Sequence, residues 1–231
     1  MEVKLISSTP NPELIAATAA RTCYSADDAN TIMSSLTEDK IKKLLQKVIK
    51  SGHHSVLEQV SFTFSIEGVS RVLLAQLTRH RIASFAVQSQ RYVNMENFHY
   101  IIPESILVDK KIDNDNKMLN KYLKFLDEAK ALYKEMIDQG IKPEDARYML
   151  PGCVLTNIVM TMNARELLHF FSLRCCNRAQ KEIRFLANEM LKLVKPLAPN
   201  IFANAGPNCV RGFCTEEKSC GKLWAKKEKK I

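Results

Sequence analysis

Residues 59–67 have the sequence QVSFTFSIE, in which every second residue is apolar. This period of two puts the apolar side chains on one face of a β-strand and the serine and threonine side chains on the other. A strand with one apolar and one polar face is typical of an antiparallel sheet that is covered on one side. The stretch therefore predicts a half-buried antiparallel strand.

Apolar residues with helical spacing flank this strand on both sides. A short strand at residues 3–5 and a helix at 12–24 open the chain, and Thr37 is placed to cap a second helix that stops at Gly52. The later expected elements are a helix at 69–80, a strand at 88–95, a long helix at 116–139, a short helix at 143–150, a strand at 154–162 and helices at 163–174 and 179–194. This order predicts an α+β fold in which long helices pack on an antiparallel sheet.

Size and charge limit how many domains and which kinds of ligand the sequence suggests. The 231 residues, 46% of them hydrophobic and 26% charged, suit one soluble globular domain. The formal net charge is +9, but six lysines and one glutamate in the last fourteen residues account for +5, which leaves +4 for residues 1–217. Arginine-rich binding of small phosphate or carboxylate ligands fits this distribution as well as nucleic acid does.

The seven cysteines are an odd number, and the first residues, MEVKLISSTPNPEL, contain no apolar stretch of signal-peptide length. We therefore expect reduced thiols and a cytoplasmic protein. Charged residues interrupt every apolar run before it reaches the roughly 20 residues of a membrane span, so no membrane partner is expected.

The densest polar segment is RHRIASFAVQSQRY at residues 79–92, with three arginines, one histidine, two serines and two glutamines. Guanidinium groups held in a rigid loop bind phosphate through two hydrogen bonds, and serine and glutamine complete such a site. A solvated basic turn is the alternative that composition alone leaves open.

This segment also resembles the signature of the flavin-dependent thymidylate synthases, in which Arg-His-Arg is followed by seven residues and a serine, here Ser89. The stretches that resemble family segments in the expected order are GHHSVLEQVSFTFSI at 52–66, SQRY at 89–92, ARYMLP at 146–151 and MNARELLHFFSLR at 162–174. The resemblance implies a family-specific, non-Rossmann fold for residues 1–208 and leaves 209–231 as a cysteine- and lysine-containing tail. The absence of a G-x-G-x-x-G motif agrees with a non-Rossmann flavin site.

The resemblance implies an enzyme that methylates dUMP to dTMP with FAD as cofactor, 5,10-methylenetetrahydrofolate as one-carbon donor and NADPH as reductant. It also implies a homotetramer in which different subunits share each active site. The residues implied to contact FAD are Ser55, Arg79, His80, Arg81, Val87, Asn163, Arg165 and His169. The residues implied to bind dUMP are Gln76, Arg79, Gln88, Ser89, Gln90, Arg91, Arg147 and Arg174.

Arg174 is the implied catalytic residue, because the resemblance implies that no protein nucleophile is used. Its guanidinium would stabilise negative charge on the uracil ring as the N3 proton is lost. Cys153 is interpreted as a small buried residue rather than a nucleophile. The chain departs from a common family pattern at Ala86 and Val87, where some members have polar residues, and at His169, where asparagine is frequent.

Three other features have structural alternatives. Ser55 and Glu58 have the spacing of a helix capping box, which is compatible with a flavin contact. No histidine pair has zinc-enzyme spacing, and the irregular spacing of Cys209, Cys214 and Cys220 is a weak metal signal, so no metal is expected. The lysine-rich end after Trp224 is expected to be flexible.

Two rival functions remain open from the sequence. A nucleic-acid-binding protein would use the arginine cluster with Phe85, Tyr92, Phe98 and Tyr100 as stacking platforms. A flavin- or nucleotide-binding relative without activity would explain the substitutions at Ala86 and Val87. The location of the charge weighs against the nucleic-acid hypothesis, because +5 of the net charge of +9 lies in the last fourteen residues, so no nucleic acid is expected as a partner.

Overall fold

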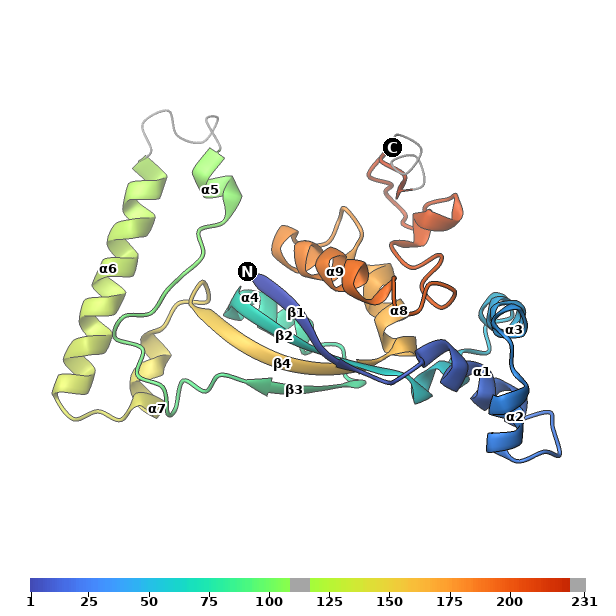
Figure 1. Cartoon of the computed structure of the whole chain (residues 1–231). Coiled ribbons are helices and arrows are strands. Elements are labelled where there is room, and N and C mark those ends of the chain that lie inside the picture. Colours follow the sequence, from blue (N-terminus) through green and yellow to red (C-terminus); the bar gives the residue numbers. More distant parts are fainter. Residues whose placement is uncertain (109–116, 225–231) are drawn as a thin grey trace. The chain divides into compact units, whose positions relative to one another are not determined.

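The computed structural model describes residues 1–108 and 117–224, in which helices are combined with a small antiparallel sheet of order β1-β2-β4-β3 (Figure 1). This agrees with the expected α+β class. The strands are β1 (Glu2–Ser8), β2 (Ser61–Ser70), β3 (Ala83–Val87) and β4 (Leu155–Asn163). The α-helices are α1 (Pro12–Thr22), α2 (Ala29–Ser35), α3 (Glu38–Lys50), α4 (Arg71–Leu77), α5 (Glu104–Val108), α6 (Lys117–Asp138), α7 (Pro143–Ala146), α8 (Ala164–Arg174) and α9 (Lys181–Val194). The 3₁₀ turns are η1 (His54–Gln59), η2 (Arg147–Met149) and η3 (Asn208–Arg211).

The chain forms two compact units, and the division between them runs through strands β2, β3 and β4. Unit 1 contains Met1 and residues 67–76 and 86–158, and unit 2 contains the rest of the chain. None of the described helices is both long enough and apolar enough to cross a membrane.

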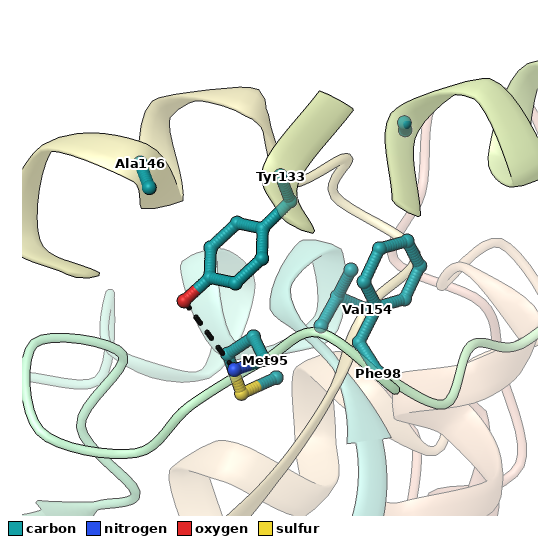
Figure 2. Close-up of a cluster of buried hydrophobic side chains, with 6 residues drawn as sticks. Met95, Phe98, Tyr133, Ala146 and Val154 are labelled. Atoms are coloured by element: carbon teal, nitrogen blue, oxygen red, sulfur yellow. Dashed lines mark hydrogen bonds between the residues drawn. The ribbon is translucent and has the colours of Figure 1, made fainter. Parts of the chain in front are cut away.

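The core of unit 1 is built around Tyr133 of α6, which is fully buried among Met95, Phe98, Ala146 and Val154 (Figure 2). The Tyr133 hydroxyl accepts a hydrogen bond from the backbone N–H of Met95 at 3.3 Å. This bond satisfies a buried backbone donor in a segment that has no regular secondary structure. The long helix therefore fixes the chain just after the predicted binding residues 88–91.

The core of unit 2 contains the predicted half-buried strand. Phe62, Phe64 and Ile66 of β2 are fully buried, while the alternate serine and threonine residues are half-buried, as the alternation predicts. Phe202 stacks edge-on against Phe62 and Phe171, with ring centroids 5.7 and 6.0 Å apart. The apolar side of α8 is thereby anchored in the core.

Two expected elements differ in position. The helix expected at 69–80 begins only at Arg71, because β2 continues to Ser70, whose hydroxyl accepts the N–H of Leu73 and caps the helix. The strand expected at 88–95 is wrong: the strand of this region is β3, and Ser89 begins a turn in which its carbonyl accepts the N–H of Val93. The polar side chains that suggested a half-buried strand serve a turn instead.

Two of the described helices, α2 and α5, were not expected from the sequence, and some expected helices are shorter in the structure. Asp28 caps α2 by accepting the N–H groups of Asn30 and Thr31. The other expected helices and strands match within a few residues, except that Asn116, the expected start of α6, lies outside the described residues. The lysines after Trp224 also lie outside them.

Candidate functional site

Helix α8 and its N-cap residue carry four of the predicted site residues, Asn163, Arg165, His169 and Arg174. Asn163 caps it by accepting the backbone N–H of Glu166 at 2.8 Å, so the helix begins at a defined residue. Leu167, Phe170 and Phe171 bury one side of the helix. Arg165 and His169 are exposed and, being four residues apart, lie on one face.

A buried hydrogen-bonded chain links this helix to the Arg-His-Arg segment. Nδ1 of His80 lies 3.0 Å from Oε1 of Glu166, and Nε of Arg174 donates to Nε2 of His80 at 3.1 Å. The side chains of His80 and Glu166 are only 3% and 8% exposed. We call His80, Glu166 and Arg174 the His80 group.

The protonation state of His80 follows from its surroundings. Burial lowers the pKa of His80 below its usual range; the hydrogen bond with Glu166 opposes this shift, and the charge of Arg174 adds to it. The ring is therefore neutral near pH 7. Because Nε2 accepts from Arg174, the single ring proton is on Nδ1 and is donated to Glu166.

The geometry near His80 also brings potential metal ligands together. One ligand atom each of His80, Glu166 and His169 lies within 4.8 Å of the others. Both nitrogens of His80 are already hydrogen-bonded, one of them to a guanidinium, which would oppose a bound cation. We interpret the arrangement as a means of orienting Arg174.

A cavity of about 1090 Å³ lies beside α8, and its lining includes Asn163, Arg165, Glu166 and His169. We call it the α8 cavity. Its volume lies just above the usual range for small-molecule and cofactor sites, about 300–1,000 Å³. Arg165, on its wall, forms an ion pair with Glu58. Of the other residues predicted to contact FAD, Ser55, Arg79, His80 and Arg81 belong to unit 2 without lining the cavity, and Val87 belongs to unit 1.

The expected capping box at Ser55 and Glu58 is wrong. These residues form the 3₁₀ turn η1, which has no side-chain cap, and the Glu58 carboxylate binds Arg165 instead. A long-range charge partner, which sequence spacing cannot reveal, determined the role of Glu58.

In unit 1, a second set of charged residues surrounds Arg147. Arg91 donates through Nε and Nη2 to Oε2 of Glu144, at 3.1 and 2.9 Å, and Nε of Arg147 donates to the backbone carbonyl of Glu144 at 3.0 Å. The Arg91–Glu144 pair is about half exposed and so adds little stability. The contacts do, however, fix where both guanidinium groups lie.

Arg71 belongs to this set, although the sequence analysis did not select it. Its Nη2 donates to the carbonyl of Gln88 at 2.8 Å. Burial, and then the charge of Arg147, lower the pKa of Arg71. We call Arg71, Arg91, Glu144 and Arg147 the Arg147 group. The sequence did contain a signal for Arg71. It stands in the first turn of an apolar helix, where the helix dipole disfavours a cation.

Two buried donors in this region lack acceptors among the described residues: Nε of Arg71 and Nε2 of Gln90. Unsatisfied buried donors are rare and cost about 1–3 kcal/mol each. An anionic or carbonyl-bearing ligand would satisfy them.

The other predicted dUMP residues have local contacts. Ser89 accepts the N–H of Arg91 through its hydroxyl at 3.2 Å, and Gln76 reaches back to the carbonyl of Val72 at 3.5 Å. Six of the set, Gln76, Gln88, Ser89, Gln90, Arg91 and Arg147, belong to unit 1, whereas Arg79 and Arg174 belong to unit 2.

The aromatic residues that a nucleic-acid-binding protein would use are only partly available. Phe98 is 3% exposed, and Lys130 covers both its ring and that of Tyr100, at 5.3 and 5.1 Å from the ring centroids. Tyr92 is exposed. Two of the four suggested stacking platforms are thus occupied by contacts within the protein.

Comparison with known proteins gives consistent matches along the chain. The model of a family described as thymidylate synthase complementing protein matches residues 4–200. The chain is 46% identical over 239 residues to the flavin-dependent thymidylate synthase of Clostridium tetani, which covers 96% of this chain and 94% of the relative. It is 45% identical over 225 residues to that of Geobacter sulfurreducens, with the same coverage, and 38% identical over 242 residues to that of Pyrococcus furiosus, covering 100% of this chain and 98% of the relative.

Proposed function

The chain belongs to the family of flavin-dependent thymidylate synthases, and from that premise we propose that it methylates dUMP to dTMP with FAD as its cofactor. The proposed one-carbon donor is 5,10-methylenetetrahydrofolate, and the proposed reductant is NADPH. The observation that carries the proposal is the His80 group, in which buried His80 holds the guanidinium of Arg174 and Glu166 lines the α8 cavity.

The residues around the α8 cavity fit a flavin. Arg165 and His169 offer a cation and an imidazole on the exposed face of α8, and the volume admits a cofactor with several rings. When bound and reduced, the flavin supplies the hydride that completes the methyl group. Asn163 already caps α8 through its side chain. A contact of Asn163 with the flavin would be a second role of this residue. A non-Rossmann mode of flavin binding is part of this proposal.

The Arg147 group is proposed to bind dUMP. The unsatisfied donors of Arg71 and Gln90 and the guanidinium of Arg147 provide several fixed N–H groups for an anion. Guanidinium groups bind phosphate through paired, charge-assisted hydrogen bonds. Arg71 is thus added to the eight residues that the family resemblance implies.

Arg174 is proposed as the catalytic residue, and Glu166 and His80 as its positioning residues. Glu166 holds the proton of His80 on Nδ1, which leaves Nε2 as an acceptor for Nε of Arg174. With one edge of the guanidinium fixed, its terminal N–H groups have a defined direction. An oriented guanidinium stabilises the negative charge that develops on the uracil ring when N3 loses its proton.

We further propose a homotetramer with shared active sites, in which the dUMP residues of the two units are completed across subunits. All seven cysteines are free thiols, which supports a reducing compartment, the cytoplasm. Cys153 is buried, as its interpretation as a core residue predicts.

The proposal is tested with the purified full-length protein. The visible spectrum after addition of FAD should show bound flavin, and tritium should be released from C5-labelled dUMP only when NADPH and methylenetetrahydrofolate are both present. Arg174→Ala should abolish tritium release while flavin stays bound; Arg21→Ala, an exposed arginine in the last turn of α1, is the control. Bound flavin without release in the wild type would indicate an inactive relative, and turnover in Arg174→Ala would refute the role of that residue.

A further inference from the structure

Four cysteines from two separate parts of unit 2 line one small cavity. Cys176 lies in the connection between α8 and α9, and Cys209, Cys214 and Cys220 lie in the C-terminal segment. The cavity measures about 10 Å³, which is room for about one water-sized group. We call it the thiol cavity. The sequence spacing of the three tail cysteines gave only a weak metal signal because it did not include Cys176.

In its described residues, the C-terminal segment is exposed over much of its length and makes several polar contacts. Among the described residues after 206, the 3₁₀ turn η3 is the regular structure, and Phe213 is 66% exposed. The segment is attached by polar contacts: Arg178 donates to the carbonyl of Lys218 at 3.0 Å and pairs with Glu216 at 3.3 Å. Exposed contacts of this kind contribute little free energy. Segments that lack an apolar core are commonly fixed by a metal or by disulfides.

Two of the four sulfur atoms accept hydrogen bonds from N–H groups. The backbone N–H of Trp224 donates to Sγ of Cys209 at 3.4 Å, and the amide of Asn177 donates to Sγ of Cys220 at 3.6 Å. The thiolate is the form of cysteine that binds metals, and N–H groups directed at sulfur are typical of the outer shell of such sites.

We propose that Cys176, Cys209, Cys214 and Cys220 bind a single Zn²⁺ ion that ties the C-terminal segment to the α8–α9 connection. Four thiolates are the most common ligand set of structural zinc, and a cavity for one atom fits a single ion better than an iron–sulfur cluster. Binding converts four thiols to thiolates and releases four protons, with no change of oxidation state.

Formation of the site requires the four sulfur atoms to move closer together. Among the described residues, three potential ligand atoms lie within 4.8 Å of one another only near His80. The sulfur atoms of the four cysteines do not yet form such a group. A tetrahedral site with Zn–S bonds of about 2.3 Å needs sulfur atoms roughly 3.8 Å apart. Three of the cysteines lie in the irregular C-terminal segment, where rotation of the side chains and small backbone shifts can provide this.

The proposed site is structural and independent of the proposed reaction. Cys176 follows Arg174 by two residues, so the ion would also fix the chain just beyond the end of α8. Its consequence for function is therefore indirect, and its test is a measurement of metal rather than of activity.

The test begins with the metal content of the full-length protein purified under reducing conditions without added chelator. We expect about one zinc per chain by elemental analysis, and, after replacement by Co²⁺, the absorption bands of a tetrahedral four-thiolate site at longer wavelengths than those of flavin. Cys214→Ser should lose the metal, whereas Cys23→Ser, an exposed cysteine far from the cavity in sequence, should retain it. Zinc-free wild-type protein that also fails to bind Co²⁺ would overturn the proposal.

Two further measurements use the wild-type protein and therefore test the zinc site even when a variant folds poorly. Trypsin should cut after Arg211 or Lys218 much faster in wild-type protein stripped of metal than in the same protein resupplied with Zn²⁺. Disulfides among the four cysteines in protein isolated under reducing conditions, or an iron–sulfur chromophore, would replace the zinc assignment and so refute it.

Discussion

His80 has both ring nitrogens bonded inside unit 2, and this makes its protonation costly in the folded state. Its pKa is lowered by burial, so below the usual value of about 6.5 the unfolded chain binds a proton that the folded chain does not. Stability should therefore fall as the pH decreases from about 6.5 toward the folded-state pKa, by up to about 1.4 kcal/mol per pH unit. At higher pH the ring is neutral in both states and this penalty is absent.

Thermal unfolding measured between about pH 7.5 and pH 5.5 tests this. The wild-type midpoint should fall more steeply on acidification than that of His80→Gln, which cannot titrate in this range. His99→Gln, which removes an exposed histidine outside the His80 group, is the control. Equal slopes in the wild type and His80→Gln would show that His80 is not held neutral.

Arg71 has a buried Nε without an acceptor among the described residues, beside the charge of Arg147. If it binds dUMP, Arg71→Lys removes the fixed fork of the guanidinium and should weaken dUMP binding about tenfold or more, since a hydrogen bond to a charged group contributes about 1.5–3 kcal/mol. Isothermal titration with dUMP measures this, and flavin affinity should be unchanged. Unaltered dUMP affinity would assign Arg71 to structure alone.

At the scale of the element, α8 depends on its cap. Asn163→Ala removes the acceptor for the N–H of Glu166 and should destabilise the protein by about 1 kcal/mol, whereas Asn163→Ser keeps a capping oxygen and most of that stability. Chemical denaturation of both variants measures the cap. Flavin titration then separates the two roles: if Asn163 also contacts FAD, the serine variant loses affinity although its helix is intact, and if it does not, affinity follows stability.

At the scale of the whole molecule, the proposed dUMP residues divide between the two units, with Arg147 in unit 1 and Arg174 in unit 2. Sites shared between subunits should allow two inactive variants to restore each other. When Arg147→Ala and Arg174→Ala chains are unfolded, mixed in equal amounts and refolded together, random assembly of a symmetric oligomer should leave about a quarter of the sites with both arginines.

Tritium release by the mixed oligomer measures this restoration, and each variant refolded alone is the control. Activity well above that of either variant would support sites that combine two subunits. A mixture as inactive as its components, although sedimentation shows mixed oligomers, would place both arginines of a site in one chain.

The sequence was sufficient wherever a periodic pattern or a local cap determines structure. The alternation from Val60 to Ile66 predicted β2, and Thr37 predicted the start of α3. The incorrect predictions concern residues whose structure depends on partners distant in the sequence. Glu58 has helix-cap spacing but binds Arg165, more than a hundred residues away. The polar residues 88–95 were expected to return as a strand, but Ser89 begins a turn there.

The amino-acid sequence by itself determined the α+β class, the order of most elements and the family, because side-chain periodicity and the Arg-His-Arg signature are properties of nearby residues. Only the tertiary structure decided that Glu166 and His80 hold Arg174, that Arg71 lies beside Arg147, and that Cys176 faces the tail cysteines. Each of these depends on contacts between residues far apart in the chain. Burial then gives those contacts their strength, since charges and hydrogen bonds removed from water act on each other more strongly.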